Sequence, residues 1–385
     1  MDAILFSKML SDKHSVDLKK LKHKYPDEFN NYIKTLKEGY YKGLPLLDFN
    51  GNQTVFLSSC TNINLDAVKL LYTAQNDSYG ISSVEDEIIS TSSIESIDFS
   101  RDSVRSIMKG YAPKDEAENR IFGLKKGFEF ISDKTIRITE ENLYTLYMMA
   151  VGDFLDDESK LALGHYYRHD EVFVVGSEIE HAGIDHRKLG KYMKSLIAFA
   201  NAKDDINDLV KASMLHFYIA YLHPYFDGNG RMARLVHMWF LVQCGYETTL
   251  FVPLSSYIER SRKKYYNAFT LVEDNYKFSG VIDLTPFLVY YNENVYNRIT
   301  DQQVAVDVLE KYKELLDSGK ITAKEAELWQ FVLSFYAGNP FTTKQLEKDF
   351  GNAAYATIRS FVLKFTDYGL LTATQMKNKV FYRIG

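Results

Sequence analysis

The chain has 385 residues, of which 46% are hydrophobic and 25% are charged, and its formal net charge is −5. This balance is typical of a globular protein with two or three domains, and the negative charge argues against nucleic-acid binding by the whole chain through bulk electrostatics. Cys60 and Cys244 are the two cysteines, so neither a disulfide framework nor a C-x-x-C metal site is expected. The apolar runs are too short for a signal peptide or a membrane span, and we expect a cytoplasmic protein with no membrane partner.

Residues 1–80 have the weakest signals and form an N-terminal region of unknown role. A Lys-rich helix is predicted from Leu18 to Leu36, with a solvated face as one interpretation and a binding patch as the other. A turn and a strand are predicted from Pro45 to Ser58. From Val84 onward the pattern is helical. The predicted helices span residues 85–95, 115–130, 140–154, 186–201, 206–222, 230–244, 256–273 and 283–296.

One segment inside this helical region has a strand pattern instead. Residues 171–176 are β-branched or aromatic except at their ends, and polar residues follow as far as Gly183. Such a pattern predicts a small β-hairpin on a helical body.

Residues 301–385 are predicted to form a connecting helix and a separate small domain. Apolar residues of the segment 301–316 recur on one helix face. Gly369 is expected to end the last of the helices that follow. These helices are predicted at residues 324–337, 343–350 and 353–368, and strands at 370–374 and 380–384 flank a turn at 376–379. Three helices followed by a hairpin predict a winged-helix domain.

The segment from His223 to Arg234 has the backbone features of an anion site. A helix is predicted to end just before His223, and Pro224 cannot continue it. Gly228-Asn229-Gly230 then supplies flexible backbone immediately before the next helix. Backbone N–H groups at a helix N-terminus, with glycines that allow close approach, bind phosphate well.

The side chains of this segment add the groups that phosphate chemistry needs. Arg231 and Arg234 occupy neighbouring positions of one helix, and guanidinium groups suit phosphate. Asp227 offers an oxygen ligand for Mg²⁺, and His223 offers a base that titrates near neutrality. The combination indicates phosphoryl or nucleotidyl transfer.

Other interpretations of this segment fit less well. An EF-hand loop with Asp227 at its third position would need carboxylates at its first and twelfth positions. These positions are Tyr225 and Val236, and neither is a carboxylate. The P-loop pattern is absent, and G-x-G alone is weak evidence for a dinucleotide fold. A simple junction between two helices would explain the Pro and Gly residues, but not the His, the Asp and both Arg residues together.

The segment resembles the signature of the Fic family, H-x-F-x-[D/E]-G-N-G-R-x-x-R, and departs from it only at Tyr225, where Phe is usual. The resemblance extends over about residues 80–300, with the hairpin at 171–183 in the place of the family's flap. It implies a mainly α Fic-type helical bundle over residues 81–300, joined to the winged-helix domain at 301–385.

The resemblance implies an enzyme that AMPylates proteins. His223 would deprotonate a Tyr, Thr or Ser hydroxyl of a target bound along the flap. The oxygen would then attack the α-phosphorus of ATP, and pyrophosphate would leave. Asp227 would hold Mg²⁺. The residues that would bind the nucleotide are Gly228, Asn229, Gly230, Arg231, Arg234 and Tyr266, the last with core packing as an equal alternative, as for Tyr265.

A second resemblance concerns the predicted helix at about residues 85–96. Thr91 and Glu95 match [S/T]-x-x-x-E-[G/N], the pattern of the helix that inhibits many Fic proteins, and Ser96 replaces the Gly or Asn. The resemblance implies that Glu95 pairs with Arg234 and blocks the γ-phosphate, as in the class with an N-terminal inhibitory helix. An ordinary helix end with a solvated Glu95 is the alternative.

Several alternatives stay open at this point. The enzyme could modify itself, form a homodimer, remove AMP or transfer another phosphate-containing group. The C-terminal domain could bind DNA as a transcriptional regulator, although its predicted recognition helix offers only Arg359 and Lys364 as cations, and a protein contact is favoured. The four other histidines of the catalytic region are expected to pack in the core rather than bind metal. They are His181, His186, His216 and His237.

Overall fold

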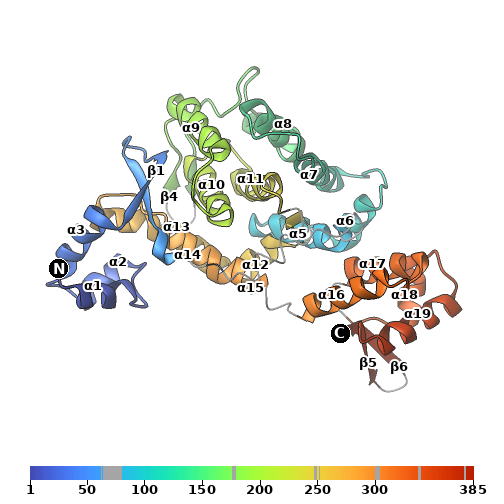
Figure 1. The fold of residues 1–385 in the computed structure, drawn as a ribbon. Coiled ribbons are helices and arrows are strands. Elements are labelled where there is room, and N and C mark those ends of the chain that lie inside the picture. Colours follow the sequence, from blue (N-terminus) through green and yellow to red (C-terminus); the bar gives the residue numbers. More distant parts are fainter. Residues whose placement is uncertain are drawn as a thin grey trace.

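The computed structural model is mainly helical, as predicted. The residues that it describes are 1–61, 63, 80–175, 179–246, 249–250, 252–299, 304–336, 340–376 and 379–385. Three segments with sequence predictions lie outside these residues in whole or in part. They are the tip of the flap hairpin (176–178), the tip of the C-terminal hairpin (377–378) and much of 62–79. The N-terminal helices lie at one side of the helical body and the C-terminal helices at the other (Figure 1). No helix in the described ranges is long and apolar enough to cross a membrane.

The N-terminal region contains three helices and a hairpin. They are α1 (Ala3–Leu10), α2 (Leu18–Lys24), α3 (Phe29–Gly39), β1 (Tyr41–Leu47) and β2 (Gln53–Leu57). The prediction of one helix from Leu18 to Leu36 is wrong, because the chain breaks around Pro26. A residue before proline avoids helical dihedral angles, and Tyr25 has φ −132° and ψ 62°.

Two buried helices form the centre of the largest hydrophobic core. They are α10 (Asp208–Leu222) and α11 (Asn229–Gln243), which pack against each other. Nearly every side chain of both helices is buried, whichever face it lies on. The helices packed around them are α5 (Gly80–Ile94), α7 (Glu116–Ser132), α8 (Glu140–Ala150), α9 (Leu189–Asn201), α13 (Arg262–Ser279) and α14 (Thr285–Tyr291).

Two features of the helical body differ from the sequence prediction. The expected helix 256–273 is two helices, α12 (Leu254–Arg260) and α13, which meet at Ser261. The Ser261 hydroxyl donates to the Tyr257 carbonyl (2.7 Å) and lies 2.8 Å from the Tyr290 hydroxyl. This side chain therefore provides a hydrogen-bond partner for a backbone carbonyl at the point where the helix breaks. The short helix α6 (Arg101–Met108), which Ser100 caps, was not predicted.

The flap hairpin pairs β3 (Phe173–Val175) with β4 (Ile179–Ala182) in antiparallel register with an irregularity. Just after its second strand, the Ile184 amide donates to the Leu222 carbonyl at 3.3 Å. This hydrogen bond joins the hairpin to the end of α10.

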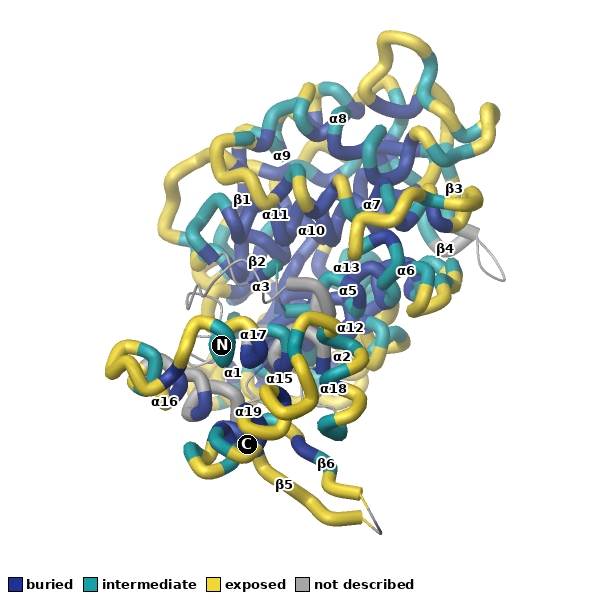
Figure 2. Tube along the Cα trace, turned by 90° about the vertical axis from the view of Figure 1, so that its right-hand side faces the viewer, coloured by how far each residue is buried: buried dark blue, intermediate teal, exposed yellow. Residues whose placement is uncertain are grey.

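The C-terminal part has its own hydrophobic core around Trp329. Its elements are α16 (Val304–Asp317), α17 (Ala323–Tyr336), α18 (Thr343–Phe350), α19 (Tyr355–Asp367), β5 (Leu371–Met376) and β6 (Lys379–Ile384). These elements follow the predicted order, although the assignment as a winged helix stays a prediction. Most of β5 and β6 is exposed (Figure 2). Helix α17 packs against α5 of the helical body.

The N-terminal hairpin is joined to α10 by one side chain. The buried Tyr218 hydroxyl donates to the Leu47 carbonyl at 2.7 Å and accepts from the Leu47 amide at 3.1 Å. Both backbone groups lie at the end of β1, where the strand pairing with β2 becomes irregular. Tyr218 therefore joins α10 to the backbone at the end of this strand.

Replacement of Tyr218 by Phe should lower the free energy of unfolding by about 1–3 kcal/mol, because two backbone groups of Leu47 lose their partner. Urea unfolding followed by circular dichroism measures this loss. Tyr111→Phe, at an exposed tyrosine, is the matched control and should change little. Equal stability of the two variants would contradict the role given to Tyr218.

Candidate active site

The loop between α10 and α11 has a defined left-handed geometry at both ends. His223 ends α10 with φ 53°, and Gly228 begins α11 with φ 80°. A side chain at position 228 would also collide with Val151. The position therefore favours glycine for its backbone conformation and for the lack of space.

The side chain of Asn229 closes this loop. Its amide oxygen accepts from the Tyr225 N–H at 2.9 Å, and its amide nitrogen donates to the Tyr225 carbonyl at 2.8 Å. Asn229 is buried, and both ends of its amide are thereby used within the loop. The role predicted for Asn229 in binding phosphate stays a prediction, whereas its contacts here give it a role in shaping the loop.

Tyr225, which departs from the Fic signature, fits the core as an aromatic ring. It is 1% exposed and stacks on Tyr147, with ring centroids 3.8 Å apart and an angle of 5° between the planes. The ring thus anchors the loop to α8, as expected for an aromatic residue at this position.

His223 is arranged to act as a base. Its Nδ1 lies 3.2 Å from the Ala220 carbonyl, which can only accept, so Nδ1 bears the hydrogen and Nε2 keeps its lone pair. Burial lowers the pKa of His223 to about 4, and the cationic groups of His181 and Arg168 act in the same direction. The imidazole is therefore neutral at pH 7 and can accept a proton.

Arg168 is a positioning residue that the sequence analysis missed. Its Nε donates to the His223 carbonyl at 2.7 Å, and its backbone N–H donates to the Pro224 carbonyl at 2.9 Å. Its two terminal nitrogens donate to the carbonyls of Asp170 and Ile184, at the two ends of the flap. This buried guanidinium links the flap to the catalytic loop, but no local motif around Arg168 indicates such contacts.

The first turn of α11 has the charged groups that an anion site needs. Arg231 and Arg234 are 5% and 3% exposed, and burial lowers the pKa of Arg231. Among the described residues, nothing hydrogen-bonds to Arg231 Nε or Arg234 Nη1, although both atoms are buried. Unsatisfied buried N–H groups are costly, so this cradle fits a phosphate that would accept from them.

Asp227 lies beside this cradle with a carboxylate that solvent reaches. Its Oδ1 accepts from the Gly228 N–H at 2.6 Å, and its Oδ2 lies 3.2 Å from Arg231 Nη2. Its side chain is 56% exposed. Mg²⁺ in nucleotide sites commonly takes one or two carboxylates plus phosphate oxygens, and Asp227 fits that donor set. The described residues contain no cluster of three metal-ligating side chains.

Glu95 and Thr91 reach the same cradle from α5. Glu95 Oε1 lies 2.6 Å from Arg234 Nη2, and Arg234 Nε donates to the Thr91 hydroxyl at 2.6 Å. A side chain at Gly230 would collide with the Glu95 carboxylate. The carboxylate therefore lies against the first turn of α11, where an anionic ligand would also be attracted.

The C-terminal end of α5 is held by side chains of α13. Arg262 donates to the Ser93 carbonyl and to the Ser96 hydroxyl, both at 3.2 Å. Ser96 has φ 60°, in the left-handed region that Gly and Asn adopt more readily than other residues. That backbone conformation accounts for the Gly or Asn of the inhibitory pattern.

The structure separates Tyr266 and Tyr265, for which nucleotide binding and core packing were the two predicted alternatives. Tyr266 is 43% exposed, and its hydroxyl donates to the Ile94 carbonyl at 3.3 Å, so it borders the site beside α5. Tyr265 is buried, and its hydroxyl lies 2.8 Å from His216 Nε2 in the core. His216 and His237 are packed among aromatic rings, as expected.

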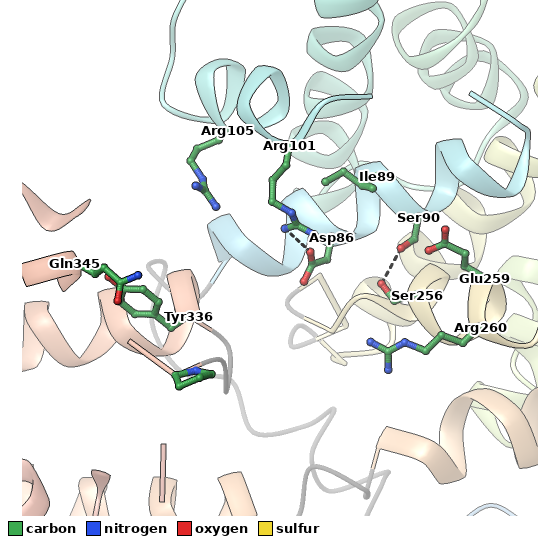
Figure 3. Close-up of a pocket in the computed structure, with 11 residues that line it drawn as sticks. Asp86, Ile89, Ser90, Arg101, Arg105, Ser256, Glu259, Arg260, Tyr336 and Gln345 are labelled. Carbon is green, nitrogen blue, oxygen red and sulfur yellow. Dashed lines mark hydrogen bonds and ion pairs between the residues drawn. The ribbon is translucent and has the colours of Figure 1, made fainter. Parts of the chain in front are cut away.

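The opposite face of α5 borders a cavity of about 580 Å³ between the helical body and the C-terminal part (Figure 3). Arg101 of α6 reaches Asp86 of α5 at 2.6 Å, and Tyr336 and Gln345 lie across the cavity. Asp86, Ile89 and Ser90 face this cavity, and Asp86 lies about half a helical turn around α5 from Glu95. The cavity is therefore separate from the anion site.

Comparisons with known proteins agree with the motif. The Fic/DOC family model matches residues 137–241, which include the flap and the catalytic loop. The protein adenylyltransferase Fic of Drosophila erecta is 24% identical over 178 residues, which are 45% of this chain and 32% of that protein. The Drosophila yakuba protein of the same name is 23% identical over the same shares. The match thus spans about a third of these relatives.

A solved structure supports the fold. The Fic family protein from Desulfovibrio desulfuricans G20 aligns with a TM-score of 0.53 and 16% identity, over 83% of this chain and 95% of that one. The family match shows a Fic domain at residues 137–241, and the relatives and the shared fold are consistent with it.

Proposed function

We propose that the chain is a protein adenylyltransferase, which transfers AMP from ATP to a Tyr, Thr or Ser hydroxyl of a target protein. The observation that carries the proposal is a neutral His223, with its Nε2 lone pair available, beside an anion cradle with two unsatisfied guanidinium N–H groups. The names of the Drosophila relatives support the reaction class and the choice of ATP.

In the proposed reaction, His223 Nε2 takes the proton of the target hydroxyl. The hydroxyl oxygen forms a bond to the α-phosphorus, and the bond from that phosphorus to the pyrophosphate oxygen breaks. Arg231 and Arg234 would neutralise the charge on the phosphates, and Asp227 would hold a Mg²⁺ ion, which supplies further charge stabilisation when bound. Catalysis then depends on the position of the groups and on charge stabilisation.

We further propose that α5 inhibits the enzyme through Glu95. Arg234 is buried and already has Glu95 and Thr91 as partners. A γ-phosphate that approached Arg234 would meet the Glu95 carboxylate, and two anions cannot share this small space without strong repulsion. ATP would then bind weakly or in an unproductive position.

Other parts of the proposal rest on the family resemblance. The target would bind along the flap at about residues 171–183, and the enzyme could also modify itself or act as a homodimer. Removal of AMP and transfer of another group are the alternatives within the family. A regulator that binds DNA is less well supported, because Lys364 of the predicted recognition helix contacts Glu325 at 2.8 Å.

Substitution of Glu95 by Gly should increase AMP incorporation from α-labelled ATP about 10- to 100-fold, because Arg234 becomes available to phosphate. Glu95→Gln should have a smaller effect in the same direction, since it removes the charge but keeps the shape. Glu129→Gly, at an exposed glutamate of α7, is the control and should behave like the wild type. A folded Glu95→Gly protein with wild-type incorporation would show that Glu95 does not inhibit.

Incorporation by the Glu95→Gly protein should fall on the acid side only as the pH approaches about 4. Protonated His223 cannot accept a proton, so activity rises with pH through the pKa of His223, which burial lowers to about 4. Rates from pH 4 to 8, with circular dichroism to confirm the fold at each pH, test this. An acid limb near 6.5, the ordinary value for histidine, would contradict the environment described for His223.

Replacement of Ser96 by Gly should strengthen the inhibition. A non-glycine residue in the left-handed region costs about 1 kcal/mol, and glycine removes that cost at the end of α5. Basal incorporation should fall and the melting temperature should rise. Ser93→Gly, inside the same helix, should have the opposite effect on both quantities. Higher basal AMP incorporation by the Ser96→Gly protein would contradict the prediction that this substitution strengthens the inhibition.

A further inference from the structure

We propose that His181 and Glu273 form a latch that fixes the flap to the catalytic end of α10. His181 lies on β4, Glu273 on α13, and the latched backbone group belongs to Tyr221. The proposal rests on the proposed function, because it assigns a positioning role for that reaction, and nothing in the Fic signature includes either side chain.

One imidazole ring makes both contacts of the latch. His181 Nε2 lies 2.7 Å from the Tyr221 carbonyl, and His181 Nδ1 lies 2.6 Å from Glu273 Oε1. Tyr221 is two residues before His223, so the ring joins the flap and α13 to the backbone that leads into the catalytic loop. The His181 side chain is 16% exposed and is thus largely shielded from water.

The partners determine the protonation of the ring while the latch is closed. A backbone carbonyl can only accept a hydrogen bond, and an ionised carboxylate can also only accept. His181 must therefore donate from both nitrogens, which makes it an imidazolium paired with Glu273. The Tyr221 carbonyl lies in the last turn of α10, where a cation is favoured by the helix dipole.

Other charged groups nearby do not replace Glu273 as the partner. The Asp48 carboxylate, from the β1–β2 turn, accepts from the amides of Asn50 and Asn52 at 2.9 and 2.7 Å. Lys277 lies beyond Glu273 on α13 and pairs with Asp274 at 2.6 Å. The titratable side chains of His223 and Tyr221 also lie beside the His181 ring, as does the ring of Phe49.

The latch has two consequences for catalysis. It holds β4, and so the flap on which the target would lie, at a fixed distance from the catalytic loop. The His181 and His223 ring centroids are 6.1 Å apart, so the cation of the latch disfavours a second positive charge on His223. Loss of the latch should therefore weaken target binding and raise the pKa of His223. It should not affect ATP binding at the first turn of α11.

The kinetic test uses the full chain with Glu95→Gly, and a His223→Ala copy of the chain as the acceptor protein. His181→Gln and Glu273→Gln should each raise the KM for the acceptor about fivefold and leave the KM for ATP within about twofold. The double variant should be no worse than either single one, because both remove the same latch. The acid limb of the rate should also move to higher pH in His181→Gln.

Two matched controls separate the latch from general effects. His23→Gln removes an exposed histidine, and Asp274→Asn removes the carboxylate next to Glu273 without touching His181. Both should leave both KM values and the acid limb unchanged. Equal changes in the KM for ATP and for the acceptor would indicate a merely structural role and overturn the proposal.

A spectroscopic measurement tests the latch without any activity. In nitrogen-15 spectra of the full chain at pH 8, both ring nitrogens of His181 should have the shifts of protonated nitrogen because both face acceptors, and Glu273→Gln should convert the ring to a single neutral tautomer. The His181→Gln spectrum identifies the signal. If Glu95→Gly incorporates no AMP, the proposed function fails while this spectrum still decides the latch. A neutral His181 ring in the unsubstituted chain overturns the latch.

Discussion

The buried guanidinium of Arg234 needs a negative partner, and much of the catalytic region follows from that need. A cation taken out of water is stable only when an anion and hydrogen bonds compensate it. Glu95 and Thr91 supply both here, at 2.6 Å each. A phosphate could supply the same compensation, so the residue that binds the nucleotide in the proposed function also binds the helix that would exclude it.

The strength of that helix as a competitor depends on its whole surroundings rather than on Glu95 alone. Glu87 of α5 is buried and caps α12 by accepting from the Ser255 N–H at 2.8 Å, and burial raises its pKa to about 7. Glu85 pairs with Arg105 of α6, and α17 packs on the same helix. Helix α5 therefore connects the anion site to the C-terminal part of the chain, across the cavity in Figure 3.

The parts of this structure that local sequence determines were predictable, and the parts that distant contacts determine were not. The catalytic loop was recognisable because its anion cradle, base and carboxylate lie within twelve residues, from 223 to 234. Arg168 and His181 were not assigned their roles, because their partners are backbone carbonyls and a carboxylate far away in the sequence. The helix break at Ser261 likewise depends on hydroxyl contacts that periodicity cannot reveal.

His223 lies between opposing charges, and this links the Glu95–Arg234 contact to the His181–Glu273 contact. Burial is the main cause that lowers the pKa of His223. His181 and Arg168 act in the same direction, whereas the Ala220 carbonyl and Glu95 favour the protonated form. Movement of Glu95 away from Arg234 would thus remove a negative charge that favours the protonated form of His223, in addition to opening the cradle. The same displacement would make the site ready for ATP and keep the base neutral. In the proposed reaction Glu95 would therefore act mainly at the anion cradle, because His223 is already neutral at pH 7 while Glu95 is in place.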